Sequence, residues 1–172
     1  MMKRHLLPAL IAALCLLVMT CAVIPRSMSR ERDIEGRSAD FGAAAKTLLV
    51  ASRTSEFKDA VIDGIEHSFE AESIAMRFLG LQDLRYESAE DYDAVVLINT
   101  CIAWSLDTQV DAFLNKYRDT GNIIVVTTSG DGHWEPKKQN RRFDTVASAS
   151  EMARVSDVVD EITAKVRPLL GD

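Results

Sequence analysis

The sequence predicts an α/β domain in which a parallel sheet is covered by helices on both faces. Short apolar runs alternate with segments whose apolar residues recur every three or four positions. The runs are apolar at successive positions, which is typical of strands that are buried on both faces. Strands and helices that alternate along a chain favour a parallel sheet between two helix layers.

Five segments are predicted to form the strands of this sheet. The strongest are A-V-V-L-I at 94–98 and I-I-V-V at 123–126, which are short, apolar and bounded by polar residues. The remaining predicted strands cover residues 47–51, 73–78 and 143–147.

Three amphipathic helices are expected between and after these strands. The first covers 55–70, and the second places four apolar residues from Val110 to Tyr117 on one face. The third has the longest apolar stripe, from Met152 to Leu169, and Ser148-Ala149-Ser150-Glu151 has the spacing of a capping box at its start. Residues 82–93 are expected to form a loop or a short helix, and 127–142 a long polar loop.

The N-terminal 24 residues differ from the rest of the chain. Residues 6–24 carry no charge and follow Lys3 and Arg4, which predicts a signal peptide or a membrane anchor over 1–24. A cleaved signal, a lipoprotein modified at Cys21 and an uncleaved anchor are three alternatives. Residues 25–45 are charged and lack a sustained apolar period, so they are expected to be a tether to a domain over 46–172. We therefore expect a location at the cell envelope.

Charge and cysteine content restrict the function of this domain. The chain has a formal charge of −6, and residues 37–172 alone carry 15 basic and 23 acidic residues, a formal charge of −8. An acidic domain repels phosphodiester backbones, so nucleic acid is excluded as an expected partner. Outside the apolar run the only cysteine is Cys101, which leaves no pair for an intrachain disulfide.

Ligands of open α/β sheets bind at the carboxyl ends of the strands, near the point where the strand order reverses. Three predicted loops lie at such ends, over 52–57, 100–107 and 129–134. The first combines hydroxyl side chains with a helix N-terminus, which is an arrangement that binds anions. The third contains two glycines, which suit tight turns.

At these loops the chain resembles the flavodoxin-like family. L-L-V-A-S-R-T-S-E-F is similar to the family's first strand and phosphate loop, usually S/T-x-T-G-x-T. Y-D-A-V-V-L-I-N-T-C-I-A-W is similar to its third strand and flavin-facing loop, and I-I-V-V-T-T-S-G-D to its fourth strand and loop. The resemblance implies a three-layer sandwich with a five-stranded parallel sheet, FMN as the cofactor and a role in electron transfer. The cofactor-binding residues that it implies are Ser52, Arg53, Thr54, Ser55, Thr100, Cys101, Trp104, Ser129, Gly130 and Asp131.

The phosphate loop departs from the family pattern at three positions. Ser55 replaces the usual glycine, Phe57 replaces the last threonine, and Glu56 places a negative charge in the first helical turn. The alternative to phosphate binding is that Thr54 or Ser55 caps the helix while Glu56 complements the helix dipole.

The other site residues also have structural alternatives. Trp104 either stacks on a flat ligand or covers the edge of the sheet, and Cys101 is either a nucleophile or a packing residue. Asp131 and His133 are too few for a metal site. No acid, base and nucleophile arrangement stands out, so an enzymatic activity is not assigned.

Two functions follow as hypotheses. In the first, the domain is an FMN-binding electron-transfer protein of the cell envelope that has a degenerate phosphate loop. In the second, it is a flavin-free module of the same fold that binds a protein partner or another small ligand. In both, the N-terminal segment would hold the chain at a membrane.

Overall fold

The computed structural model describes residues 31–40 and 46–171. Residues from Arg32 onward form one compact unit. The predicted signal peptide or anchor over 1–24 lies outside the described residues. Within the part of the chain that is described, no helix combines the length and the hydropathy that crossing a membrane requires.

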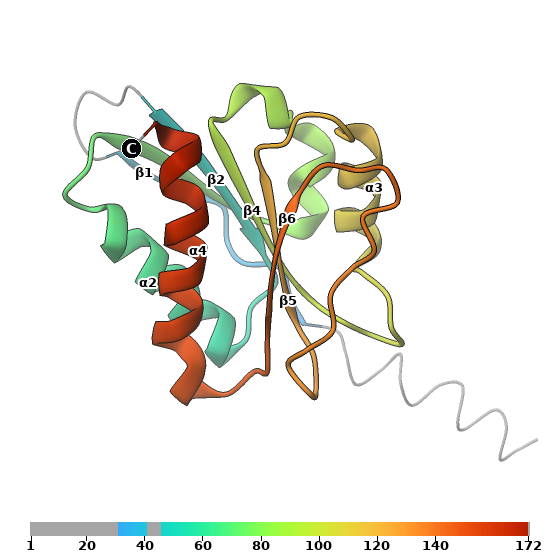
Figure 1. Ribbon diagram of the computed structural model, residues 1–172. Coiled ribbons are helices and arrows are strands. Elements are labelled where there is room, and N and C mark those ends of the chain that lie inside the picture. Colours follow the sequence, from blue (N-terminus) through green and yellow to red (C-terminus); the bar gives the residue numbers. More distant parts are fainter. Residues whose placement is uncertain (1–30, 41–45, 172) are drawn as a thin grey trace, which may run out of the picture. The chain divides into compact units, whose positions relative to one another are not determined.

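A six-stranded sheet forms the centre of the domain (Figure 1). Its strands lie in the order β1-β3-β2-β4-β5-β6. All neighbouring pairs are parallel except β1 with β3, which is antiparallel. In chain order the strands are β1 (Arg37–Asp40), β2 (Lys46–Ser52), β3 (Ile74–Gly80), β4 (Ala94–Thr100), β5 (Ile123–Thr128) and β6 (Asp144–Ser148).

The five parallel strands have the order of a flavodoxin-like sheet. When they are numbered one to five along the chain, from β2 to β6, their order in the sheet is 2-1-3-4-5. This is the flavodoxin-like doubly wound order, and its direction reverses between the first and third of these strands. The switch point therefore lies between the carboxyl ends of β2 and β4. The predicted fold class is confirmed, with six strands in place of five.

Successive residues of the central strands supply two separate cores. Leu48 and Val50 of β2 belong to one buried cluster, while Leu49 and Ala51 belong to the other. This division follows from the pleat, because neighbouring side chains of a strand point to opposite faces. Both faces of the strand are apolar because both are covered by helices.

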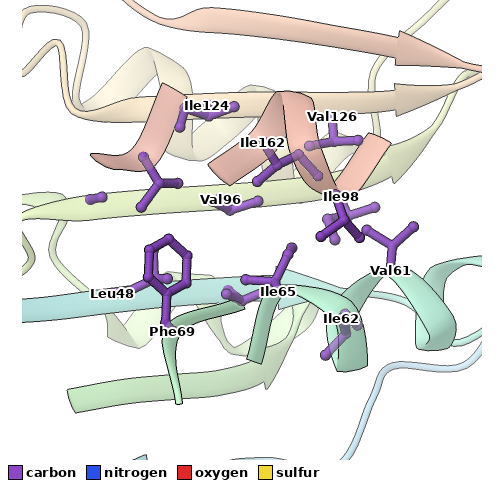
Figure 2. Close-up of a cluster of buried hydrophobic side chains, with 14 of the residues drawn as sticks. Leu48, Val61, Ile62, Ile65, Phe69, Val96, Ile98, Ile124, Val126 and Ile162 are labelled. Atoms are coloured by element: carbon purple, nitrogen blue, oxygen red, sulfur yellow. The ribbon is translucent and has the colours of Figure 1, made fainter. Parts of the chain in front are cut away.

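The first core is closed by α2 (Glu56–Phe69) and α4 (Val155–Leu170), which pack against each other on one face of the sheet (Figure 1). Figure 2 shows Val61, Ile65 and Phe69 of α2 pointing toward the strands, with Ile162 of α4 beside them. These α2 residues recur at four-residue steps, so they form one stripe along the helix.

The second core lies under α3 (Thr108–Lys116) and two short 3₁₀ helices, η1 (Leu81–Tyr86) and η2 (Ala89–Asp91), on the opposite face (Figure 1). Val110, Phe113, Leu114 and Tyr117 are all buried there, as their spacing predicts. The rings of Phe113 and Tyr117 contact each other with centroids 4.7 Å apart. The region expected to be a loop or short helix is thus these two 3₁₀ helices.

Two elements differ from the sequence prediction. Strand β1 lies within the range expected to be a tether, where Arg37–Asp40 pairs with β3. The last helix begins at Val155, after the 3₁₀ helix η3 (Met152–Arg154), and Ser148 is the end of β6. The Ser148 hydroxyl donates to the Ala149 carbonyl, so the capping-box prediction is wrong.

Candidate functional site

Each of four neighbouring parallel strands ends in a hydroxyl residue. Ser52, Thr100, Thr128 and Ser148 are the last residues of β2, β4, β5 and β6. Thr100 pairs in register with Thr128, and Thr128 with Ser148. Because carboxyl ends of parallel strands meet at one edge, the loops that follow these strands surround the switch point, where the sequence predicted the site.

The loop after β2 satisfies its hydroxyl groups within the chain. Ser55 is the N-cap of α2, and its Oγ accepts a hydrogen bond from the Lys58 N–H at 3.3 Å. The Thr54 hydroxyl donates to the Asp59 carboxylate at 2.7 Å, and the Ser52 hydroxyl donates to the Arg53 carbonyl at 2.8 Å. These contacts match the capping alternative, in which side-chain oxygens serve the helix terminus.

Arg53 lies between two carboxylates that come from distant parts of the chain. One terminal nitrogen is 3.2 Å from Asp33, while the Nε and the other terminal nitrogen are 3.0 and 2.9 Å from Asp107. Asp107 is also the N-cap of α3, because it accepts from the Gln109 N–H. We call Asp33, Arg53 and Asp107 the edge clamp.

A buried polar row lies beneath the loops. Lys58 of α2 is 0% exposed, and its Nζ donates to the Thr100 hydroxyl at 2.6 Å. The Thr100 and Thr128 hydroxyls are 3.2 Å apart, so the row continues to the next strand. The side chain of Asn99 lies on the opposite face of β4, where its amide nitrogen donates to the Val126 carbonyl and the Thr127 hydroxyl. Lys58 occupies a helix position where the sequence pattern gives no sign of burial, so it was not among the predicted site residues.

The loop after β4 forms a tight hairpin. Ile102 and Ser105 exchange backbone hydrogen bonds, and the two residues between them have positive φ, 52° at Ala103 and 60° at Trp104. Such turns usually contain glycine or asparagine, because other residues are strained there. The hairpin holds Trp104 outward, where it is 74% exposed. Strained backbone persists only where the surrounding structure holds it, and such positions are frequent at ligand-binding sites.

This strain gives a testable prediction. Ala103→Gly is expected to raise the free energy of unfolding by about 0.5–1 kcal/mol, because glycine adopts positive φ without the cost that a Cβ adds. Urea denaturation of the two proteins measures the difference. Ala112→Gly is the matched control: it lies on the exposed side of α3 and should lower the same free energy by about 1 kcal/mol. Equal changes in both variants would contradict strain at Ala103.

A cavity of about 330 Å³ lies beside the hairpin. Its lining includes five of the ten predicted site residues, and Ala103 is the sixth lining residue. The lining consists of Cys101, Ala103, Trp104, Ser129, Gly130 and Asp131. The structure thus brings Trp104 together with the Ser129–Asp131 turn, which the sequence predicted to face the ring, whereas Thr100 does not line this cavity. The phosphate-loop residues do not line this cavity.

The two ionisable groups of the cavity have shifted pKa values. Burial raises the pKa of the Cys101 thiol, and the charge of Asp131 adds to this, although the Trp104 and Ser105 N–H groups act in the opposite direction. At neutral pH Cys101 is therefore a thiol, which suits packing better than nucleophilic attack. The pKa of Asp131 is lowered by hydrogen bonds from the Ser129 hydroxyl and the His133 N–H.

A larger groove, of about 800 Å³, runs along the exposed side of α3. The segment 134–141 forms its other wall, and Trp104 and Trp134 both contribute to its lining. Arg141 anchors this segment: its guanidinium contacts Asp111 at 2.6 Å and donates to the carbonyls of Lys137 and Lys138. From the sequence, Lys137, Lys138, Arg141 and Arg142 form a small basic patch that is expected to be a solvated loop, with docking of an acidic partner or of lipid headgroups as the alternative.

No protein-family model matches the chain, and no curated protein matches its sequence. Solved structures do match it. An oxidoreductase from Corynebacterium diphtheriae is 15% identical, with 73% of this chain and 96% of that chain covered and a TM-score of 0.49. Oxidised flavodoxin 2 from Bacillus cereus is 13% identical, with 72% and 99% covered and a TM-score of 0.49. General stress protein 14 from Treponema denticola, solved in complex with FMN, is 12% identical, with 72% and 99% covered and a TM-score of 0.43.

The fold assignment rests on the geometry of the chain itself. The 2-1-3-4-5 order of β2 to β6, the helices on both faces and the loops at the switch point are the features that define this doubly wound type. By these features the chain has the flavodoxin-like fold.

Proposed function

We propose that the cavity beside Trp104 binds the ring of a flavin and that the domain transfers electrons through it. The observation that carries this proposal is the strained hairpin, which holds an exposed indole next to a cavity between the loops that follow β4 and β5. An aromatic side chain in that position offers a face on which a flat ring stacks. The cavity volume is at the lower end of the about 300–1,000 Å³ that small-molecule sites occupy.

The residues of the cavity would bind and orient the ring. Trp104 would cover one face, while the Ser129–Asp131 turn would border an edge; the Asp131 carboxylate is already fixed by the Ser129 hydroxyl at 2.7 Å. A bound flavin would accept electrons from a reduced protein partner and pass the same number to an oxidised one. The acidic domain surface would favour partners with a basic docking face.

FMN as a whole fits this site less well than its ring does. The ring side offers a cavity and an exposed indole. On the phosphate side, Arg53 is held by two carboxylates and the hydroxyls of Thr54 and Ser55 are bonded within the chain. The degenerate phosphate loop that the sequence suggested is therefore part of the proposal, and no step is assigned to the phosphate group.

The proposed location is the cell envelope. The uncharged run over 6–24 supports export or anchoring, whichever way the N-terminus is processed. A domain held at a membrane would exchange electrons with partners at the same surface, because tethering raises their local concentration.

Flavin titration of the full chain tests the proposal. The chain, purified in mild detergent, is expected to quench flavin fluorescence at micromolar concentrations. Trp104→Ala should weaken binding by about tenfold or more, since stacking on one aromatic side chain is worth about 1–3 kcal/mol. Tyr86→Ala is the control, because Tyr86 is equally exposed (73%) but does not line the cavity.

The second candidate function is a flavin-free module that binds a protein partner or another small ligand. The internally bonded phosphate loop favours it. If the full chain is colourless and leaves flavin fluorescence unquenched at about 100 μM, far above the usual range for a resident cofactor, the flavin proposal is wrong and this second function remains.

A further inference from the structure

We infer that the flavin bound here carries no terminal phosphate, so that riboflavin is preferred to FMN. This inference rests on the proposed flavin site and names its ligand more closely. It follows from what occupies the place where a flavin phosphate would be bound, the loop between β2 and α2.

The first observation is that a segment of the chain itself lies along this loop. The Arg32 carbonyl accepts a hydrogen bond from the Thr54 N–H at 2.7 Å, and the Ile34 N–H donates to the Ser52 carbonyl at 3.4 Å. Asp33 forms an antiparallel bridge with Arg53 between these two contacts. A phosphate loop binds its ligand through backbone N–H groups, and here the Thr54 N–H is already paired with a carbonyl.

The second observation is that the Asp33 carboxylate is fixed in this position. One oxygen accepts from the Leu81 N–H and the other from the Gln82 N–H, each at 3.2 Å, at the start of η1. Gly80 has no Cβ, and one placed there would overlap the Asp33 side chain. Asp33 therefore joins the end of β3 to the loop after β2 and cannot turn aside for an incoming anion.

The third observation is the local charge. The edge clamp pairs the Arg53 guanidinium with both Asp33 and Asp107, so the cation of the loop is already neutralised. Glu56 adds a carboxylate in the first turn of α2. Lys58 is fully buried and its ammonium contacts the Thr100 hydroxyl, inside the fold. A phosphate dianion would meet more negative than positive charge here, whereas an uncharged ribityl chain would not.

The test compares the dissociation constants of FMN and riboflavin for the full chain, measured by flavin fluorescence in low salt. Riboflavin is expected to bind at least as tightly as FMN. Asp33→Asn, which removes one carboxylate and releases Arg53 from it, should tighten FMN binding about tenfold and leave riboflavin binding unchanged. Asp40→Asn is the matched control, because it changes the net charge equally but lies on β1.

Two results would overturn the inference: FMN binding that is tighter than riboflavin binding in the unmodified chain, or equal FMN gains in Asp33→Asn and Asp40→Asn. A further measurement needs neither a flavin nor a variant. Inorganic phosphate, compared with chloride at equal ionic strength, is expected to leave the melting temperature of the chain unchanged, and a rise specific to phosphate would contradict a closed loop. If neither flavin binds, the proposed function is wrong. The melting temperature in phosphate still shows whether the loop between β2 and α2 binds a phosphate ion.

Discussion

Gly132→Ala is expected to lower the free energy of unfolding by about 2–5 kcal/mol, for two reasons that add. Gly132 has φ of +71°, a region in which a Cβ costs about 1–2 kcal/mol. A Cβ at this position would also lie 2.6 Å from the Ala149 backbone nitrogen, and backbone atoms cannot move aside cheaply. Such overlap costs about 1–3 kcal/mol more. Urea denaturation followed by far-ultraviolet circular dichroism measures the loss.

Gly130→Ala, in the same loop, is the control for this prediction. Gly130 has no positive φ, and a Cβ there would meet no atom within 4 Å, so its effect should stay within about 0.5 kcal/mol. Both variants add one methyl group. The difference between their free energies of unfolding therefore measures the combined cost of the positive φ at Gly132 and of the close approach to Ala149. A loss at Gly132 as small as that at Gly130 would mean that the loop moves freely away from β6.

The central strands and the helices could be predicted from the sequence because burial determines their composition. Strands β4 and β5 are apolar at successive positions because helices cover both faces of the sheet. The apolar residues of α2 recur on one side of the helix because only that side is buried. Strand β1 gives no such signal. R-S-A-D at Arg37–Asp40 is a mostly exposed edge strand that pairs through its backbone, which the side chains do not reveal.

The part of the candidate site that lines the cavity could also be predicted from the sequence. Trp104 and the turn that begins at Ser129 follow clear strands, and the carboxyl ends of parallel strands meet by geometry. The conformation of the hairpin could not be predicted from the sequence, because alanine and tryptophan, the residue types of Ala103 and Trp104, rarely adopt positive φ.

The phosphate side could be predicted only in part. Ser55 has the residue type of an N-cap, and in the structure it is the N-cap of α2. Asp33 was missed because it precedes the predicted domain and contacts Arg53 across 20 positions of sequence. Lys58 was missed because a lysine on an amphipathic helix normally indicates a solvated face. Contacts of charged residues over long distances in sequence produce no periodic pattern, so a single sequence does not reveal them.

Arg141→Met is expected to lower the free energy of unfolding by about 2–4 kcal/mol, since the Arg141 guanidinium is nearly buried, with its side chain 4% exposed. It contacts Asp111 and donates to the carbonyls of Lys137 and Lys138. Its removal takes the donor from Asp111 and from the Lys137 carbonyl, while the Lys138 carbonyl keeps the backbone N–H of residue 141. Hydrogen bonds that involve a charged group contribute about 1.5–3 kcal/mol each, and the partly exposed Asp111 recovers some of this from water. Methionine preserves the packing of the stem near the Phe143 ring.

Arg142→Met separates this effect from the loss of a positive charge. Arg142 is exposed, and its one side-chain hydrogen bond in the described structure reaches the Asp119 carbonyl at 3.4 Å, so a change below about 1 kcal/mol is expected. Urea denaturation gives both values, and the emission of Trp134, in the wall that Arg141 anchors, should shift only in Arg141→Met. Equal stabilities of the two variants would show that an apolar side chain replaces this buried cation without loss, as it does in some proteins.

Arg141→Lys should recover little of the free energy of unfolding that Arg141→Met loses, because an ammonium cannot serve three acceptors in the fixed geometry of a guanidinium.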